Sequence, residues 1–270
     1  FKGGIMHKFI TMTAFSGLLV SAMLATTPTL AQSSRSVINP TALQKKIAVI
    51  LKMPHRSAKN RRRDRNRDPV RAMEFCRLKD NMKVLEWGPG RGWYTEILGV
   101  LLKDRGQLYA SNRAVSLKRL NKLLKSPLMR AVKKLPVKVI RHPITHDITI
   151  DTLDFGMRDA DMALNIREYH NLDMKTVDKF NAATYQALKP GGYYCIIDHT
   201  RRHMGPDTNE NRRRMDPVKI IKQVQDAGFK FVDYTNLFLR LDDELRFEVG
   251  RKTVRGNTDR FTLLFQKPQS

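Results

Sequence analysis

Two kinds of segment, distinguished by the spacing of their apolar residues, alternate along the chain. Short apolar runs rich in Val, Ile and Tyr are typical of buried strands, and apolar residues three or four positions apart are typical of helices. From residue 68 onward this pattern predicts seven strands, at 83–87, 106–111, 137–142, 160–166, 193–198, 229–235 and 259–268. It predicts helices at 68–78, 93–103, 115–125, 173–188 and 216–228. The alternation indicates an α/β domain with a mostly parallel sheet and helices on both faces.

The first part of the chain has the pattern of a secretory signal. Residues 1–5 precede the first methionine, and we interpret them as an addition ahead of the natural start. A short basic start is followed by the uncharged, mostly apolar stretch 9–25, and Thr29-x-Ala31 is a small-residue cleavage site. We therefore expect a signal peptide at 1–31 and a periplasmic or secreted protein. The alternative is an uncut membrane anchor, although the apolar run is short for a span.

Residues 32–67 are predicted to be a basic N-terminal extension ahead of a domain at 68–270. The chain has 50 Lys and Arg against 26 Asp and Glu, a formal net charge of +24. Much of the excess lies in the run 55–71, "HRSAKNRRRDRNRDPVR", which follows a predicted helix at 41–53 with Thr41 as its N-cap. A field of this sign attracts anionic partners. The alternative is that the excess charge is spread over a solvated surface. Nothing in the sequence indicates an integral-membrane partner.

Only two cysteines occur, Cys76 in a predicted helix and Cys195 in a predicted strand. Their apolar surroundings favour buried, unpaired thiols, and no CxxC spacing suggests zinc. An oxidising compartment permits a bridge between them without requiring one.

Three glycines follow the first predicted strand, in the arrangement Glu86-x-Gly88-x-Gly90-x-Gly92. Glycine adopts positive φ and lets a ligand approach the main chain without a Cβ in the way. The phosphate-binding pattern GxxxxGK[ST] is absent, and the dinucleotide pattern GxGxxG would place the third glycine one residue later. In open parallel sheets this first strand-to-helix turn is where ligands bind.

The segments "VLEWGPGRGWYTEIL", "NIREYHN" and "ALKPGGYYCIIDH" resemble class I S-adenosylmethionine-dependent methyltransferases. Within that family they are similar to a branch of predicted bacterial methyltransferases that often carry signal peptides. The resemblance covers about residues 68–270. It implies a Rossmann-like seven-stranded fold and S-adenosyl-L-methionine as the cofactor.

The resemblance also implies a set of cofactor-binding residues. Gly88, Gly90 and Gly92 would lie against the amino-acid and ribose portions of the cofactor, and Glu86 would organise their loop. In the family the second strand usually ends in an acid that holds the ribose hydroxyls, whereas this chain has Asn112 there. An amide can make such hydrogen bonds without the charge. Asn165, at the end of the fourth strand, completes the predicted set.

The candidate catalytic residues follow the fourth and fifth strands. In the family that the chain resembles, the residues that follow the fourth strand face the transferred methyl group. Among them, His170 is the first candidate for a general base, because imidazole titrates near neutral pH. Tyr169 and His199 are further candidates. The alternative is that His170 only caps or packs the next helix. His199 and Asp198 are adjacent on a strand and point to opposite faces, so we expect His199 to converge with His170 instead.

Two arginines after the fifth strand, Arg201 and Arg202, are interpreted either as ligands of an acidic acceptor or as solvated side chains. No metal site is expected. The predicted function is methyl transfer from S-adenosylmethionine to an unidentified small-molecule or polymer acceptor. The alternative is an exported, non-catalytic protein that binds polyanions on a methyltransferase-like scaffold. A nucleic-acid methyltransferase is disfavoured, because "NIREYHN" stands where base-amino methyltransferases carry an NPPY-type loop.

Overall fold

The structure is a computed structural model, and it describes residues 39–269. From Pro40 onward the chain forms one compact unit. The predicted signal peptide at 1–31 lies outside the described residues. Within them, none of the helices combines the length and the apolar character that crossing a bilayer would need.

Seven strands form a single sheet in the order β3-β2-β1-β6-β7-β9-β8. The first five strands in this order are parallel, and β9 runs antiparallel to both β7 and β8. This confirms the predicted seven-stranded, mostly parallel sheet. The strands are β1 (Lys83–Trp87), β2 (Gln107–Asn112), β3 (Val132–Pro136), β6 (Ala160–Ile166), β7 (Leu188–His199), β8 (Lys230–Thr235) and β9 (Arg260–Gln266), with a separate hairpin of β4 (Ile140–Arg141) and β5 (Ile148–Thr149).

Several of the α-helices begin at residues whose side chains accept hydrogen bonds from the first backbone N–H groups. Thr41 and Gln44 form a capping box at the start of α1, and Asp68 and Asp216 accept hydrogen bonds at the starts of α4 and α8. The α-helices are α1 (Ala42–Lys52), α2 (Ala58–Arg61), α3 (Asp64–Arg67), α4 (Pro69–Phe75), α5 (Thr95–Leu102), α6 (Ala114–Leu117), α7 (Val177–Ala187) and α8 (Pro217–Asp226). Short 3-10 turns are η1 (Lys118–Leu120), η2 (Leu123–Lys125), η3 (Pro127–Met129) and η4 (Tyr169–Asn171).

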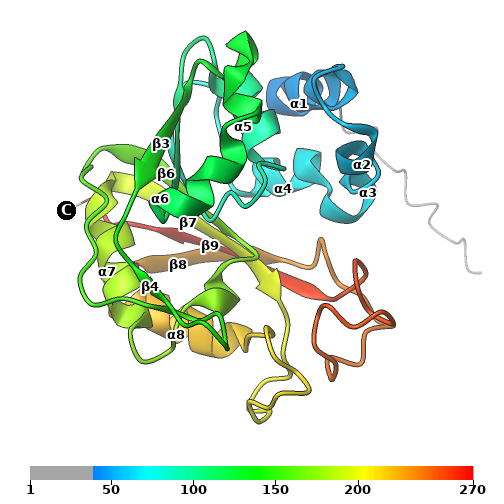
Figure 1. Cartoon of the computed structure of the whole chain (residues 1–270), viewed down its shortest axis with the longest axis vertical. Helices are drawn as coiled ribbons and strands as arrows, with labels where there is room; N and C mark the ends of the chain where they lie inside the picture. Colours follow the sequence, from blue (N-terminus) through cyan, green and yellow to red (C-terminus); the bar gives the residue numbers. More distant parts are fainter. Residues whose placement is uncertain (1–38, 270) are drawn as a thin grey trace, which may run out of the picture. The chain divides into compact units, whose positions relative to one another are not determined.

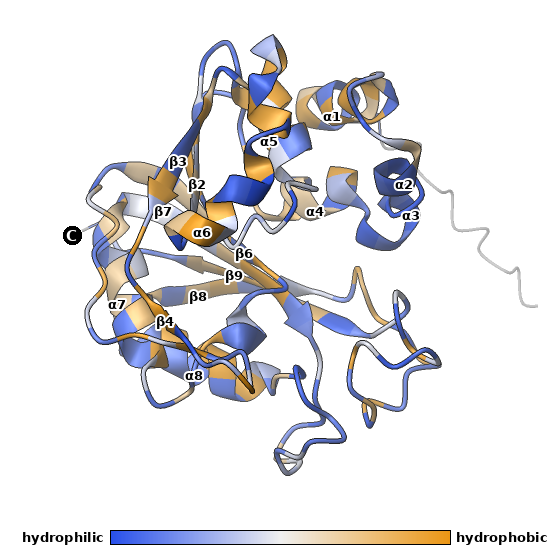
Figure 2. Cartoon of the chain, viewed as in Figure 1, coloured by the Kyte–Doolittle hydropathy of each residue, from blue (hydrophilic) through white to orange (hydrophobic). Residues whose placement is uncertain are grey.

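The sheet has an apolar core on each face (Figure 1). One core joins α1, α4 and α5 to strand residues such as Val84, and the other joins α7 and α8 to strand residues such as Leu85. Successive strand residues thus serve opposite faces, as the period of two requires. Figure 2 shows apolar residues along the strands and α5, whereas α2 and α3 are strongly hydrophilic.

Two predicted elements differ in the structure. The third strand of the sheet is β3, pairing Val132 with Leu108 of β2, and not the predicted segment 137–142. β3 is an edge strand with no fully buried residue, so it lacks the apolar signature of an inner strand. The predicted helix 115–125 is instead broken into α6, η1 and η2.

The two cysteines are joined in a disulfide, so the prediction of unpaired thiols is wrong. Cys76 ends α4 and Cys195 lies within β7, with their Cα atoms 5.6 Å apart. The residues are 119 positions apart in sequence. Only the packing of α4 against this face of the sheet brings them together.

The basic segment ahead of residue 68 is packed against the sheet-and-helix domain. Arg56 is fully buried, and its guanidinium donates to Glu96 of α5 at 2.7 Å and to both carboxylate oxygens of Asp64 at 2.7 and 2.8 Å. Trp93 Nε1 also donates to the carbonyl of Asn60, at 3.0 Å. The described part of the predicted extension therefore belongs to the same compact unit as the domain.

Candidate functional site

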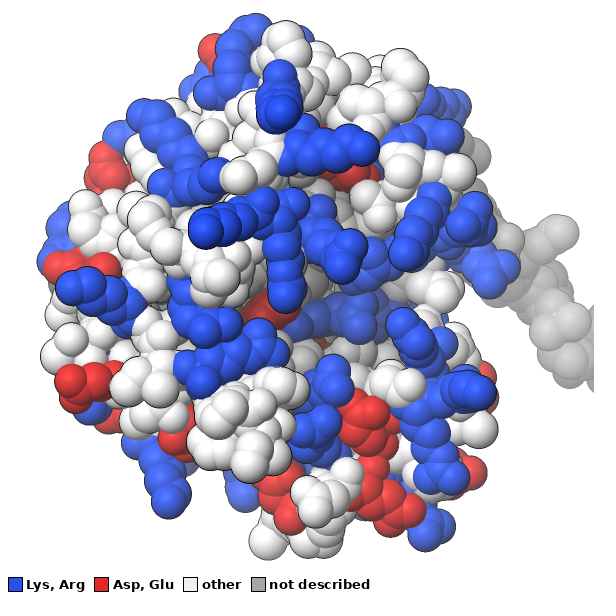
Figure 3. Space-filling model, in the orientation of Figure 1, with Lys and Arg blue, Asp and Glu red and all other residues white. Residues whose placement is uncertain are grey.

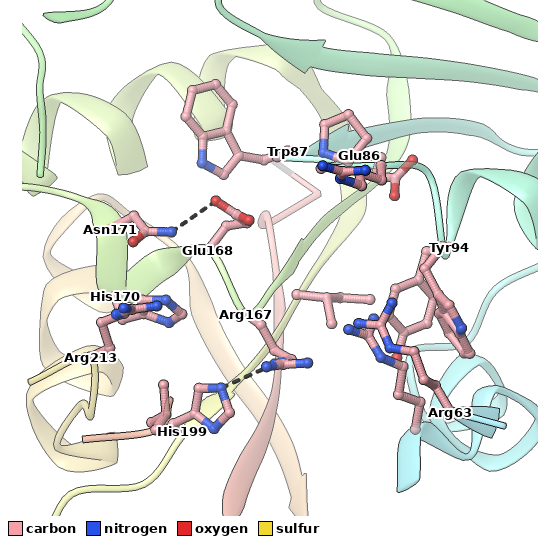
Figure 4. A pocket seen from close by; sticks show the side chains of 18 of the residues that line it. Arg63, Glu86, Trp87, Tyr94, Arg167, Glu168, His170, Asn171, His199 and Arg213 are labelled. Atoms are coloured by element: carbon pink, nitrogen blue, oxygen red, sulfur yellow. Dashed lines mark hydrogen bonds between the residues drawn. The ribbon is translucent and has the colours of Figure 1, made fainter. Parts of the chain in front are cut away.

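A cavity of about 530 Å³ opens beyond the carboxyl ends of β1 and β6. β1 has β2 on one side and β6 on the other, so the strand order reverses here, which is where open parallel sheets bind ligands. The cavity is lined by the glycine loop, the segment after β6, the end of β7, and the helices α2 and α3 of the basic segment: Lys59, Asn60, Arg63, Arg67, Glu86–Arg91, Trp93, Tyr94, Ile166–Glu168, His170, Asn171, His199, Arg213 and Val249. Figure 4 shows side chains from these segments pointing toward a common space.

The three loop glycines all have positive φ, and each has a different neighbour. Gly90 (φ +59°) faces open space, since a Cβ added there would meet no atom within 4 Å. An added Cβ on Gly88 (φ +67°) would overlap the side chain of Glu168. Gly92 (φ +83°) packs against Leu120 and Leu123 and does not line the cavity. Gly88 and Gly90 therefore line the cavity, and Gly92 packs behind the loop.

Glu86 is the penultimate residue of β1, between Leu85 and Trp87, and it lines the cavity beside the loop. Its carboxylate is almost fully buried and accepts a hydrogen bond from Thr95 Oγ1 at 2.8 Å. Burial raises the pKa of Glu86 to about 7. A carboxyl group with such a pKa exchanges its proton near neutral pH and would be ionised by a cationic ligand.

His170 is paired with Asp198 across the gap between the two strand ends. His170 Nδ1 lies 2.6 Å from Asp198 Oδ1, and the backbone N–H of His170 donates to Asp198 Oδ2 at 3.0 Å. An ionised carboxylate only accepts, so Nδ1 carries the proton and Nε2 is the basic nitrogen. Within residues 39–269, His170 Nε2 has no hydrogen-bond partner. This is the geometry of a base held by an orienting carboxylate.

His199 lies close to His170, with their ring centroids 5.6 Å apart, but has different surroundings. Its Nε2 accepts from Arg167 Nε at 3.0 Å, and its Nδ1 lies 2.7 Å from Thr258 Oγ1. Burial, together with the charge of Arg167, holds the pKa of His199 well below its usual value. His199 is thus a neutral residue that positions Arg167 (Figure 4).

Besides Gly92, three of the predicted site residues do not line the cavity. Tyr169 is fully buried and accepts from Asn181 Nδ2 at 2.9 Å, because the single turn η4 directs it toward the core beneath α7. Asn165 is fully buried beside the hydroxyl of Tyr194. Asn112 caps the next backbone amide, with Oδ1 accepting from Arg113 N at 2.7 Å. The structure therefore does not bring Tyr169, Asn165 or Asn112 to the candidate site.

The two arginines proposed to hold an acidic acceptor also lie away from the cavity. Arg201 is buried and forms an ion pair with Asp207 at 2.9 Å, and neither it nor Arg202 is a lining residue. Sequence reasoning instead missed Arg63 and Arg67, which enter the cavity wall from the basic segment. The high density of arginine in residues 55–71 was the available signal. The sequence did not show that this segment packs beside the glycine loop.

The side chains of His170, Asp198 and His199 come close enough for their ligand atoms to share one metal ion, with all of these atoms within 4.8 Å of one another. Hydrogen bonds already engage His170 Nδ1 and both ring nitrogens of His199. The cation of Arg167 beside His199 also opposes a second positive charge. The arrangement favours a hydrogen-bonded set over metal binding, and the absence of a metal stays a prediction.

No protein family model matches the chain, and no curated protein matches it in sequence. Solved structures do match its fold. A SAM-dependent methyltransferase from Aquifex aeolicus is 19% identical with a TM-score of 0.54, covering 83% of this chain and 97% of the other. The [4+2]-cyclase SpnF is 15% identical with a TM-score of 0.55, covering 81% and 86%. A SAM-dependent methyltransferase from Mesorhizobium loti is 12% identical with a TM-score of 0.50, covering 74% and 97%.

These likenesses, with the strand order and the single antiparallel strand β9, show the class I methyltransferase fold. At such identities the similarity extends to the fold alone. A cyclase stands among the neighbours, so the chemistry must be argued from this chain's own cavity.

Proposed function

We propose that the protein is an S-adenosylmethionine-dependent methyltransferase whose acceptor is deprotonated by His170. One observation carries the proposal. The positive-φ glycine loop after β1 opens, at the switch point of the sheet, onto a cavity that is also lined by His170, which the buried Asp198 orients from behind. The glycine loop and the oriented base thus line the same cavity. The fold of the neighbours supports the proposal.

The residues around the loop fit the amino-acid portion of such a cofactor. The open space at Gly90 leaves its backbone accessible from the cavity. Trp87, which lines the cavity, has a buried Nε1 with no hydrogen-bond partner in the described part of the chain. Glu86, Gly88 and Gly90 would hold this portion. The ribose contact assigned to Asn112 finds no support, because Asn112 lies outside the cavity wall.

The bound cofactor would supply a methyl group on a positively charged sulfur, which is reactive toward nucleophiles. The protein's own contribution is to orient the acceptor and to take its proton. His170 Nε2 accepts that proton, and Asp198 stabilises the imidazolium through the 2.6 Å contact at Nδ1. The buried rings of Trp93 and Tyr94 form part of the wall and limit the entry of water.

The test is calorimetric titration of the chain with S-adenosylmethionine and S-adenosylhomocysteine. The variant is Gly90→Asp, and the matched control is Gly156→Asp. Both glycines have positive φ (+59° and +66°) and open space at the Cβ position, but only Gly90 lines the cavity. The two variants therefore carry a similar backbone strain, and we expect only Gly90→Asp to lose binding by tenfold or more.

The second candidate is the non-catalytic, exported protein that binds polyanions. The concentration of arginine at the cavity favours it. It predicts no heat with either nucleoside at millimolar concentration, and binding to a polyanion that weakens steeply with salt. That outcome with the unmodified chain would overturn the enzyme proposal. A periplasmic location rests on the segment 1–31 and is part of both proposals.

A further inference from the structure

Four arginines gather at the side of the cavity formed by the basic segment and the ends of β6 and β9. We call them the arginine cluster: Arg63, Arg67, Arg167 and Arg260. They line a smaller adjoining cavity of about 100 Å³, and the first three, with His199, also line the main one. Figure 3 shows Lys and Arg side chains gathered around a hollow on this face. The cluster is therefore continuous with the site of the proposed reaction.

None of the four has a carboxylate within 4.0 Å among residues 39–269. Elsewhere this protein pairs its buried arginines. Arg56 is held by Asp64 and Glu96, and Arg214 by Asp243. Buried charges are ordinarily paired because leaving water is costly. Of the four, Arg260 is fully buried, Arg67 and Arg167 are half-buried and Arg63 is exposed. Arg260 thus lacks the carboxylate partner that the fully buried Arg56 and Arg214 have.

The positive charges in the cluster disfavour one another. Burial and the nearby charge of Arg167 lower the pKa of Arg67 to about 9 and that of Arg260 to about 10. The pKa of Arg63, at the rim, is lowered for the same two reasons. These guanidiniums would gain from an opposite charge placed among them.

Neutral groups hold the cluster in place. The guanidinium of Arg67 lies over the ring of Trp93 at 4.6 Å, and that of Arg260 over the ring of Phe238 at 4.4 Å. Arg167 donates to His199 at 3.0 Å. None of these contacts neutralises charge. The donors are thus pre-arranged, and planar guanidinium forks match the oxygens of carboxylate and phosphate.

We propose that the arginine cluster binds the carboxylate or phosphate group of a small-molecule methyl acceptor. As a statement about the acceptor, this rests on the proposed methyltransferase function. The adjoining cavity, of about 100 Å³, is large enough for one oxyanion group. Through Arg167 and His199 the cluster reaches the neighbourhood of His170, so an acceptor anchored there presents its nucleophile to the base.

The test is titration of the chain with inorganic phosphate at constant ionic strength, followed by calorimetry and by the melting temperature. The variants are Arg67→Gln and, at the rim, Arg63→Gln. The matched control is Arg65→Gln, which removes the same charge from the same segment at an exposed position outside both cavities. We expect phosphate affinity to fall tenfold or more in Arg67→Gln, and several-fold in Arg63→Gln. It should change less than twofold in Arg65→Gln.

Equal losses in all three variants would overturn the proposal, as would binding of a single-stranded oligonucleotide without binding of phosphate. Either result would indicate a diffuse basic surface. The outcome is separable from that of the methyltransferase proposal. The chain could bind phosphate through Arg67 and yet bind no S-adenosylmethionine. That result would support the anion site and overturn the methyltransferase proposal. Binding of S-adenosylmethionine by a chain that binds no phosphate would support the methyltransferase proposal and overturn the anion site.

Discussion

Arg214 is fully buried and Arg67 is half-buried, and the groups around their charges differ. Arg214 donates to both oxygens of Asp243, at 2.8 and 2.9 Å, and also to the carbonyls of Thr200 and Phe247. Arg67 lies on an aromatic ring beside other arginines, and its pKa is lowered to about 9 mainly by burial. The first arginine joins parts of the chain, and the second is left with its charge uncompensated.

This difference separates charges that hold the fold from charges that await a ligand. A charge that serves folding is matched by the chain itself, as Arg56 is by Asp64 and Glu96. A charge that serves binding is held by neutral contacts, so that its opposite can come from outside. Four measurements would sharpen or break the distinction.

The largest effect is expected from Arg214→Met. It leaves Asp243 buried without its cation, which costs about 3–5 kcal/mol of unfolding free energy. Urea denaturation would measure it. The double variant with Asp243→Asn should recover part of the loss, because no charge is then left buried. A loss below about 1 kcal/mol would mean that Arg214 does not hold the fold.

The disulfide between Cys76 and Cys195 also joins distant parts of the chain, through a covalent bond. Replacing Cys76 and Cys195 together by alanine should lower the unfolding free energy by about 2–4 kcal/mol, because the cross-link closes a long loop in the unfolded chain. Denaturation of the oxidised protein with and without reductant measures the same quantity independently. If the two thiols are unpaired in the isolated protein, the reductant would not change the denaturation curve.

The third measurement is the pH dependence of stability, which depends on Glu86, an ionisable residue that lines the cavity. Its folded-state pKa of about 7 lies above the ordinary 4.5. Between these values the folded protein keeps a proton that the unfolded chain releases, so stability falls as pH rises from about 4.5 to 7. Glu86→Gln removes that fall. The stability of the variant relative to the unmodified protein should therefore rise by about 1–3 kcal/mol between pH 4.5 and 8.

Thermal or urea unfolding of both proteins across this pH range would supply the comparison. Glu168 also has a raised pKa, caused mainly by burial, and it is present in both proteins. Parallel curves for the two proteins would contradict the raised pKa of Glu86.

The smallest effect is expected from Arg67→Met. Removing a charge that no carboxylate compensates, while keeping an apolar chain against Trp93, should change the unfolding free energy by less than about 1 kcal/mol, or raise it. Urea denaturation beside Arg214→Met gives the contrast directly. A loss as large as that of Arg214→Met would show that Arg67 is a structural residue, and the distinction would fail.

Local patterns predicted the sheet and the glycine loop well. The loop after Trp87 needs positive φ at three positions, and glycine is the residue that adopts it readily, so spacing alone located the turn. The inner strands are buried on both faces and read as apolar runs. The edge strand β3 is exposed, and its position was therefore predicted wrongly. Capping by Thr41 and Asp68 was also readable, because a cap involves only neighbouring residues.

The sequence by itself therefore determined the features that arise within a few residues of one another: strand and helix periodicity, caps, and the glycine turn. Only the tertiary structure decided which distant side chains meet. His170 pairs with Asp198 from 28 positions away, Cys76 with Cys195 from 119, and Arg67 meets Arg260 across almost the whole described chain. The single turn η4 sends Tyr169 to the core and leaves His170 at the cavity. The physical reason is that hydrogen bonds, disulfides and charge repulsion depend on distances of a few ångströms in space, which packing sets and sequence separation does not.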